Sequence, residues 1–300
     1  MDLGKKPALA DLIGVIEIGS GGVWILGGTV ADDEKGAVWL GRNGHGATVA
    51  RDGRNARQGK FSVFSFSVCG RDSRRMEIFE KLLLWVDPVR RSGPEAMAVD
   101  QWLLETTKIP VLRVYGWAGE WASVGYFGEI AGASAAFPGV NLVRRWTGGG
   151  IVDHRADWTY TVVAPQGEAL AGWRGAESYR RIHAALAETL TAENIDVQPS
   201  DGGEETGAAL CFENPVSHDL RGGADGRKIA GAGQRRTRLG LLHQGSVAVG
   251  CCEAKSRERS EDFASRVASD WEIFRIQPDL REISQRVAAR YALREWTCRR

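Results

Sequence analysis

The order of apolar and polar residues predicts short strands and amphipathic helices from about residue 76 onward. Short apolar runs bounded by glycine, proline or charged residues are typical of buried strands. They predict strands at residues 82–86, 111–115, 121–126, 142–146, 208–212 and 241–249, and a strand pair within 151–163. Because strands and helices follow no regular βαβ order, the pattern favours an α+β fold with a mixed β-sheet and flanking helices.

Helices and one hairpin complete this pattern. Ser92, Pro94 and Glu95 are typical of a helix start, and apolar residues follow them at helical spacing. A second amphipathic helix is indicated by Tyr179, Ile182, Leu186 and Leu190. Closing helices are indicated by Phe263, Val267, Trp271, Ile283, Val287 and Tyr291. Segments 219–220 and 228–232 flank a glycine-rich turn at 222–226 and predict a hairpin.

Residues 1–75 differ from the rest, because they are rich in Gly, Arg, Asp and Ser and show apolar alternation only at 61–66. Three interpretations are open: a small β-rich addition, a disordered N-terminal extension, or a start-site artefact with Met76 as the true start. We therefore divide the chain into residues 1–75 and a catalytic domain at 76–300. Peptides from residues 1–70 in the natively expressed protein would contradict a start at Met76.

Composition narrows the class of protein. The 300 residues carry a formal net charge of +1, so no strong field favours nucleic acid or a membrane surface as partner. No apolar run is long enough to span a bilayer. The five cysteines are odd in number and form no metal-binding spacing, so we expect a reducing cytoplasm and no bound metal.

The first candidate constellation is centred on the glycine triplet Gly148, Gly149 and Gly150. Three glycines allow a backbone to approach a ligand closely. Arg144 and Arg145 just ahead are suited to gripping a phosphate or a carboxylate, with Thr147 and His154 nearby. A mobile loop beside a solvated strand edge is the alternative.

The second constellation is centred on Lys228, which small and apolar residues follow. A partly desolvated ammonium group there can stabilise the negative charge that develops in acyl transfer. A surface lysine beside a turn is the alternative.

Cys211 is the third candidate. A cysteine on a strand is commonly inert packing, and it becomes a nucleophile where a nearby cation lowers its pKa. Lys228 and His218 are the cations that the fold has to bring close for that purpose.

Five segments in this order resemble the lipoate–protein ligase and octanoyltransferase family, within the biotin/lipoate ligase superfamily. They lie at 95–104, 110–117 and 123–127, in RRWTGGGIVDH from Arg144 to His154, and in GRKIAGAGQRR with HQGS downstream. The resemblance covers over half of the chain. It implies a biotin/lipoate ligase-like catalytic core, whose glycine motif lines the acyl pocket and whose Lys228 contacts the acyl carbonyl.

The resemblance also implies the remaining substrate-binding residues, Asp219, Gly231 and Gln234. The hypothesis that these residues favour is transfer of an octanoyl or lipoyl group through a Cys211 thioester, without a cofactor. The donor is then acyl carrier protein or another carrier domain. The acceptor is a lysine of a lipoyl-carrier domain of the E2 or glycine-cleavage H type.

Two alternatives stay open. One is an ATP- and Mg²⁺-dependent lipoate–protein ligase that works through a lipoyl-adenylate. His218 precedes Asp219 where many ligases have asparagine, and Arg155 follows His154 where the family often has aspartate. The other is a non-catalytic protein that binds an acyl chain or a carrier protein. The arginine–glycine segment RRWTGGG differs from the corresponding pattern of biotin ligases.

Overall fold

The computed structural model describes residues 14–18, 22–26, 31–33, 36–43, 46–51, 63–64, 77–202, 217–223, 226–250 and 252–299. The chain divides into two compact units, Met1–Met76 and Glu77–Arg300. In the first, β1 (Gly14–Ile18) pairs with β2 (Gly22–Leu26). A separate antiparallel sheet contains β3 (Ala31–Asp33), β4 (Gly36–Asn43), β5 (Gly46–Arg51) and β6 (Val63–Phe64). The start at Met76 stays a prediction.

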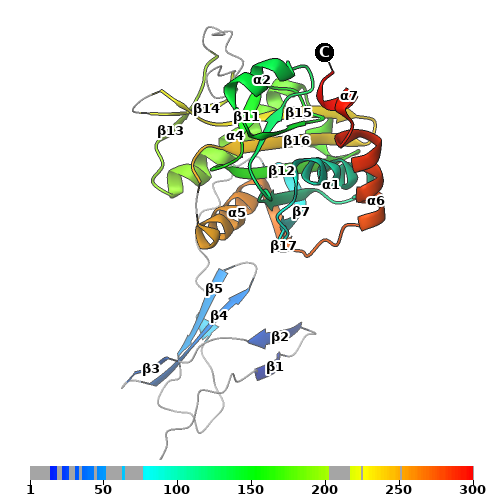
Figure 1. Ribbon diagram of the computed structural model, residues 1–300. Helices are drawn as coiled ribbons and strands as arrows, with labels where there is room; N and C mark the ends of the chain where they lie inside the picture. Colours follow the sequence, from blue (N-terminus) through cyan, green and yellow to red (C-terminus); the bar gives the residue numbers. More distant parts are fainter. Residues whose placement is uncertain are drawn as a thin grey trace, which may run out of the picture. The chain divides into compact units, whose positions relative to one another are not determined.

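An eight-stranded sheet forms the centre of the second unit (Figure 1). Its spatial order is β13 (Val197–Pro199), β14 (Leu220–Gly222), β15 (Lys228–Thr237), β16 (Gly240–Val247), β12 (Trp158–Pro165), β8 (Val111–Tyr115), β7 (Phe79–Val86) and β17 (Ala268–Ile273). The pairs β7–β8 and β7–β17 are parallel, whereas the other neighbours are antiparallel. The predicted mixed sheet is therefore confirmed.

Helices cover both faces of this sheet, so its central strands are buried on both sides. On one face, α4 (Gly175–Ala192) and α5 (Glu253–Val267) pack on a core that includes Leu112 and Val114. On the other face, α1 (Gly93–Thr106), α6 (Leu280–Arg286) and the π-helical turn η2 (Val287–Tyr291) pack on Val111 and Tyr115. Successive residues of β8 thus enter opposite cores, as the period of two requires.

Three short helices complete the second unit: α2 (Ile130–Ala136), α3 (Ala169–Gly172) and α7 (Arg294–Thr297). The predicted start of α1 is confirmed. The backbone N–H and the hydroxyl of Ser92 both donate to the Glu95 carboxylate, at 3.0 and 2.7 Å. These hydrogen bonds, above all the one from the hydroxyl, lower the pKa of Glu95.

The expectation that Trp271 lies on a closing helix is wrong. Helix α5 ends at Val267, and Trp271 lies on β17, which pairs in parallel with β7. The spacing from Phe263 through Val267 to Trp271 is helical, but the edge of β7 offers backbone groups that need partners. The strand predicted at 208–212 lies outside the described residues.

A second, three-stranded sheet carries the glycine motif. β9 (Trp121–Val124) lies between β10 (Asn141–Arg144), which is parallel to it, and β11 (Ile151–Asp153), which is antiparallel. Residues 145–150 join β10 to β11. The predicted sequence of strand, glycine turn and strand is therefore confirmed.

Candidate functional site

Lys228 begins β15 and forms a buried ion pair. Its Nζ lies 2.7 Å from Oδ2 of Asp219, and the two residues are 3% and 0% exposed. The other oxygen of Asp219 accepts a hydrogen bond from the hydroxyl of Tyr179, which in turn accepts one from the backbone N–H of Ala232. The expected desolvation of Lys228 is confirmed. Tyr179, which the sequence analysis assigned only to a helix face, fixes the orientation of the carboxylate that holds it.

Glycines of β15 make this arrangement possible. A Cβ on Gly231 would lie 2.4 Å from Cε and 2.6 Å from Nζ of Lys228. A Cβ on Gly233 would lie 2.3 Å from the carbonyl oxygen of Gly148. Side chains at these positions would collide with the lysine and with the glycine loop. The Lys228 side chain and the glycine loop can therefore lie against β15 only because positions 231 and 233 have no side chain.

Arg145 fixes the glycine loop through hydrogen bonds to its backbone carbonyls. Its guanidinium donates to the backbone carbonyls of Gly148 and Gly150 and to the carbonyl and the hydroxyl of Ser123, at 2.7–3.1 Å. Gly149 has φ +97°, a conformation that disfavours any other residue. The expected closeness of backbone here is thus realised between two protein segments, because Gly125 would collide with the carbonyl of Gly149 if it had a Cβ.

The structure gives Arg144 a different partner from the phosphate or carboxylate suggested by the sequence. Its guanidinium donates to six backbone carbonyls among the described residues: those of Gly125, Tyr126, Gly128, Trp296, Thr297 and Arg299. Burial, together with the positive charge of Arg299, lowers the pKa of Arg144. Arg144 therefore joins the loop after β9 to the C-terminal segment. The sequence could not show this, because the carbonyls come from opposite ends of the domain.

His154 belongs to a buried polar chain. Its Nε2 lies 2.6 Å from the hydroxyl of Ser123, and its Nδ1 lies 2.7 Å from Oδ2 of Asp157. Since Ser123 accepts from Arg145, its hydroxyl proton can point to Nε2, which leaves the Nδ1 proton for Asp157. Asp157 was missed by the sequence analysis. The available signal was its place three residues after His154, with Arg155 where the family often has a carboxylate.

A narrow pocket lies between these segments. It is lined by Met97, Tyr115, Trp117, Arg145, Val152, His154, Thr159, Gly231, Ala232, Gly233, Gln244, Gly245 and Ser246. The hydroxyls of Thr159 and Ser246 donate to Asp157, at 3.0 and 2.6 Å. Because these polar side chains are already satisfied by one another, the wall suits an apolar ligand with few polar atoms.

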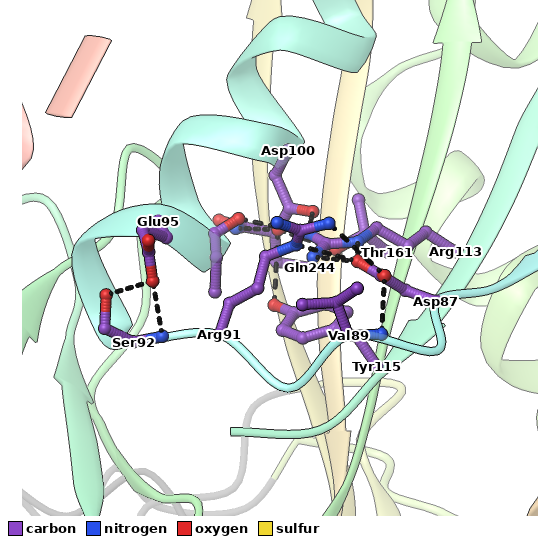
Figure 2. Close-up of polar contacts among 11 residues, drawn as sticks. Asp87, Val89, Arg91, Ser92, Glu95, Asp100, Arg113, Tyr115, Thr161 and Gln244 are labelled. Carbon is purple, nitrogen blue, oxygen red and sulfur yellow. Dashed lines mark hydrogen bonds and ion pairs between the residues drawn. The ribbon is translucent and has the colours of Figure 1, made fainter. Parts of the chain in front are cut away.

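Gln244 connects the pocket to the buried charges that Figure 2 shows. Its amide donates to Asp100 at 2.6 Å, and its carbonyl accepts from the hydroxyl of Thr147 at 2.8 Å. Asp100 also pairs with Arg113 at 2.6 Å. Burial, with the charge of Asp100, raises the pKa of Tyr115 above its ordinary value. The hydroxyl of Thr147 is therefore linked through Gln244 to the buried charges of the domain core.

Gln234 contacts His243, one of two buried histidines whose rings pack edge to face. Its amide nitrogen lies 3.0 Å from Nδ1 of His243. Nδ1 of His183 donates to the backbone carbonyl of His218, which precedes Asp219. Burial lowers the pKa of His183 to about 4 and the pKa of His243 well below its ordinary value. Both rings are therefore neutral near pH 7, and His183 stabilises the turn that presents Asp219 through its hydrogen bond to His218.

Cys211, the predicted nucleophile, lies outside the described residues, as does Cys251. The described chain stops at Gly202 and resumes at Ser217. A Cβ on Gly202 would lie 2.3 Å from the hydroxyl oxygen of Ser217. Because Cys211 is not among the described residues, its role as nucleophile stays a prediction.

The fold and this site define a class of protein. Residues 92–288 match the model of the lipoyl protein ligase A/B catalytic domain, and the chain belongs to that family. Its relatives include octanoyltransferase LipM of Carboxydothermus hydrogenoformans. The two are 32% identical over an alignment of 174 positions that covers 55% of this chain and 64% of that one. LipM of Moorella thermoacetica is 35% identical over 50% of this chain and 59% of its own. The chain thus spans less than two thirds of these relatives.

Solved structures show the same fold. A putative lipoate protein ligase of T. acidophilum with bound lipoic acid has a TM-score of 0.57 at 18% identity and covers 74% of this chain and 99% of its own. Lipoate–protein ligase A bound with ATP has a TM-score of 0.55 at 19% identity, over the same shares. The expected lipoate-ligase-like core is confirmed. Among the residues placed by the structure, no cluster of metal-binding side chains and no helix able to cross a bilayer is found.

Proposed function

We propose that the chain transfers an octanoyl or lipoyl group through a Cys211 thioester to a lysine of a lipoyl-carrier domain. The observation that carries the proposal is the buried pair of Lys228 and Asp219 beside a narrow pocket with an apolar wall. Resemblance to relatives named octanoyltransferase supports the choice of acyl group. In this proposal the glycine triplet and the segment around Lys228 both belong to one acyl-binding site.

In the first step, the Cys211 sulfur attacks the carbonyl carbon of an acyl thioester on a carrier protein. A carbon–sulfur bond to Cys211 forms, and the bond to the carrier sulfur breaks. The proton of Cys211 passes to the departing thiolate, so the carrier leaves as a free thiol. Lys228 stabilises the oxyanion of the tetrahedral intermediate, because a preformed cation needs no reorganisation when the charge develops.

In the second step, a lysine amine of the acceptor domain attacks the thioester carbon. A carbon–nitrogen bond forms, the bond to Cys211 breaks, and an amine proton restores the thiol. Thioester exchange followed by amide formation needs no ATP. Because Cys211 acts as a reduced thiol, we place the reaction in the cytoplasm.

Asp219 is a positioning residue in this mechanism. Its carboxylate receives Lys228 on one oxygen and Tyr179 on the other. Arg145, whose guanidinium donates to the carbonyls of Gly148 and Gly150, lines the pocket together with Gly231 and Gly233. We assign the acyl chain to this pocket, which His154 also lines, and we keep Gln234, three residues after Gly231, as a proposed substrate-binding residue.

Intact-protein mass spectrometry tests the proposal. The full chain is mixed with octanoyl-carrier protein without ATP, and the expected result is a mass gain of one octanoyl group that is lost in Cys211→Ala. A lipoylated acceptor that appears only with ATP and free lipoate would replace the transferase with a ligase. Binding of the acyl chain without transfer to any carrier domain would favour a non-catalytic protein.

A further inference from the structure

Six side chains near the glycine loop form a closed ring in which cations and aromatic groups alternate. In order around the ring they are Tyr126, Arg235, Trp146, Arg290, Trp296 and Arg299. Each guanidinium carbon lies 4.2–5.2 Å from the centroids of the two rings beside it. We call this set the arginine ring. Such distances are those of cation–π interactions, which hold the three cations in place.

Among the residues placed by the structure, no acidic side chain balances the charges of the arginine ring. Within the described part of the chain, none of Arg235, Arg290 and Arg299 forms an ion pair with a carboxylate. Since neighbouring cations share an aromatic ring, they lie within about the 10 Å over which charges interact in 0.1 M salt. Nε of Arg235 is also buried and has no hydrogen-bond partner in the described ranges. Three cations held this close repel one another unless an anion joins them.

The arginine ring adjoins the acyl pocket. Trp146 stands between Arg145 and Thr147, and Arg235 follows Gly233 by two residues on β15, which is about 7 Å of strand. Arg145 and Gly233 line the pocket. The other half of the ring comes from the C-terminal segment, which Arg144 fastens to the domain. A group bound at the ring therefore lies within a few residues' length of the acyl chain.

We propose that the arginine ring binds a phosphate group of the acyl donor. The three arginines are partly exposed, so the edges of their guanidinium groups remain accessible. A guanidinium fork matches the geometry of phosphate oxygens, and several forks around one phosphate bind it with orientation. The inference rests on the proposed function, in which a carrier protein delivers the acyl thioester. The arm of an acyl carrier protein is phosphopantetheine, whose phosphate is the expected ligand; the phosphates of ATP are the second source with the same chemistry.

Two thioesters that differ only in the phosphate test this proposal. Octanoyl-phosphopantetheine and octanoyl-pantetheine are offered to the full chain, and the rate of Cys211 acylation is followed by mass spectrometry. Charge-assisted hydrogen bonds to one phosphate correspond to roughly tenfold to hundredfold in affinity. We expect the KM for the phosphorylated donor to be lower by that factor. In Arg235→Gln and in Arg299→Gln the ratio of the two KM values should fall toward one.

Matched variants separate charge from packing. Arg238→Gln removes an exposed cation just beyond the ring and should keep the preference for phosphate. Arg235→Lys keeps the charge without the fork and should keep only part of it. Equal KM values for both donors in the unmodified chain, or a preference that survives Arg235→Gln, would overturn the proposal.

The outcomes also separate this inference from the function on which it rests. Failure of both thioesters to acylate Cys211 would refute the transferase and not the anion site. Calorimetry with MgATP then decides the source of the phosphate. Binding of MgATP that is lost in Arg235→Gln, without any preference for phosphopantetheine, would keep the phosphate site and assign it to the nucleotide. No binding of either phosphate would refute the site.

Discussion

Replacing Gly231 with alanine tests whether β15 needs a residue without a side chain at this position to leave room for the side chain of Lys228. The new Cβ would lie 2.4 Å from Cε and 2.6 Å from Nζ of Lys228, and 3.2 Å from Oδ1 of Asp219. Real Cβ atoms do not approach other atoms at 2.4 Å, so the lysine side chain has to move. Its movement separates the ammonium group from the carboxylate that lies 2.7 Å away.

The magnitude follows from these contacts. Overpacking a tight interior costs about 1–3 kcal/mol of unfolding free energy, and disturbing a buried ion pair costs about 3–5 kcal/mol when one partner is lost outright. Because the Gly231→Ala change displaces Lys228 without removing it, we expect a loss of about 1–3 kcal/mol. A displacement of about 1 Å in a catalytic group can lower the rate of transfer on the order of a hundredfold.

Urea unfolding gives the first quantity, and the rate of octanoyl transfer from carrier to acceptor domain gives the second. Gly172→Ala is the matched control, because its Cβ would meet nothing within 4 Å and the residue lies away from the site, on α3. A Gly231→Ala protein with the stability and the transfer rate of this control would refute the argument that β15 needs a glycine beside Lys228.

Three further predictions concern buried polar groups. Asp219→Asn leaves the ammonium of Lys228 buried without that carboxylate, so urea unfolding should show a loss of about 3–5 kcal/mol, and an unchanged midpoint would contradict the buried pair. Asp157→Asn removes a charged acceptor for three side chains, so we expect the free energy of unfolding to fall by about 1–3 kcal/mol and acyl transfer to become slower. A variant with the stability and the transfer rate of the parent would contradict this prediction. The pKa of His183 is lowered to about 4 and that of His243 is also lowered, so their contribution to stability is complete above about pH 6.5 and is lost as pH falls toward 4. His183 alone should account for about 2 kcal/mol between pH 7 and pH 5, measured as the difference between the parent and His183→Gln, and equal pH dependence in the two proteins would exclude this role.

The sequence predicted the elements whose pattern is local. The strand at 111–115 coincides with β8, and the hairpin before and after the glycine-rich turn is formed by β14 and β15. The helix with Tyr179 is α4. Periodicity and turn residues suffice in these cases, because the same residues that form each element also carry its signal. Trp271 was misassigned because pairing with β7 outweighs a helical spacing.

The site was predictable in its residue types but not in its partners. Lys228 was singled out, whereas the hydroxyl of Tyr179, forty residues from Asp219, was not. Arg144 was expected to hold a ligand, but its partners include carbonyls of Trp296 and Thr297 more than 150 residues away. Such contacts depend on how the C-terminal segment packs on β10. No local pattern encodes that packing, and for the same reason the arginine ring has no signature in the sequence.

The most direct test of the account is discharge of an isolated acyl-enzyme. The full chain is loaded with octanoyl-carrier protein, separated from the donor, and then mixed with a lipoyl-carrier domain in the absence of ATP. The account predicts that the octanoyl group leaves Cys211 and appears on one lysine of the acceptor, as followed by mass spectrometry. The rate of this transfer should be higher for the parent than for Gly231→Ala. An octanoyl group that stays on the enzyme, or an acceptor modified at the same rate by Cys211→Ala, would contradict the central claim.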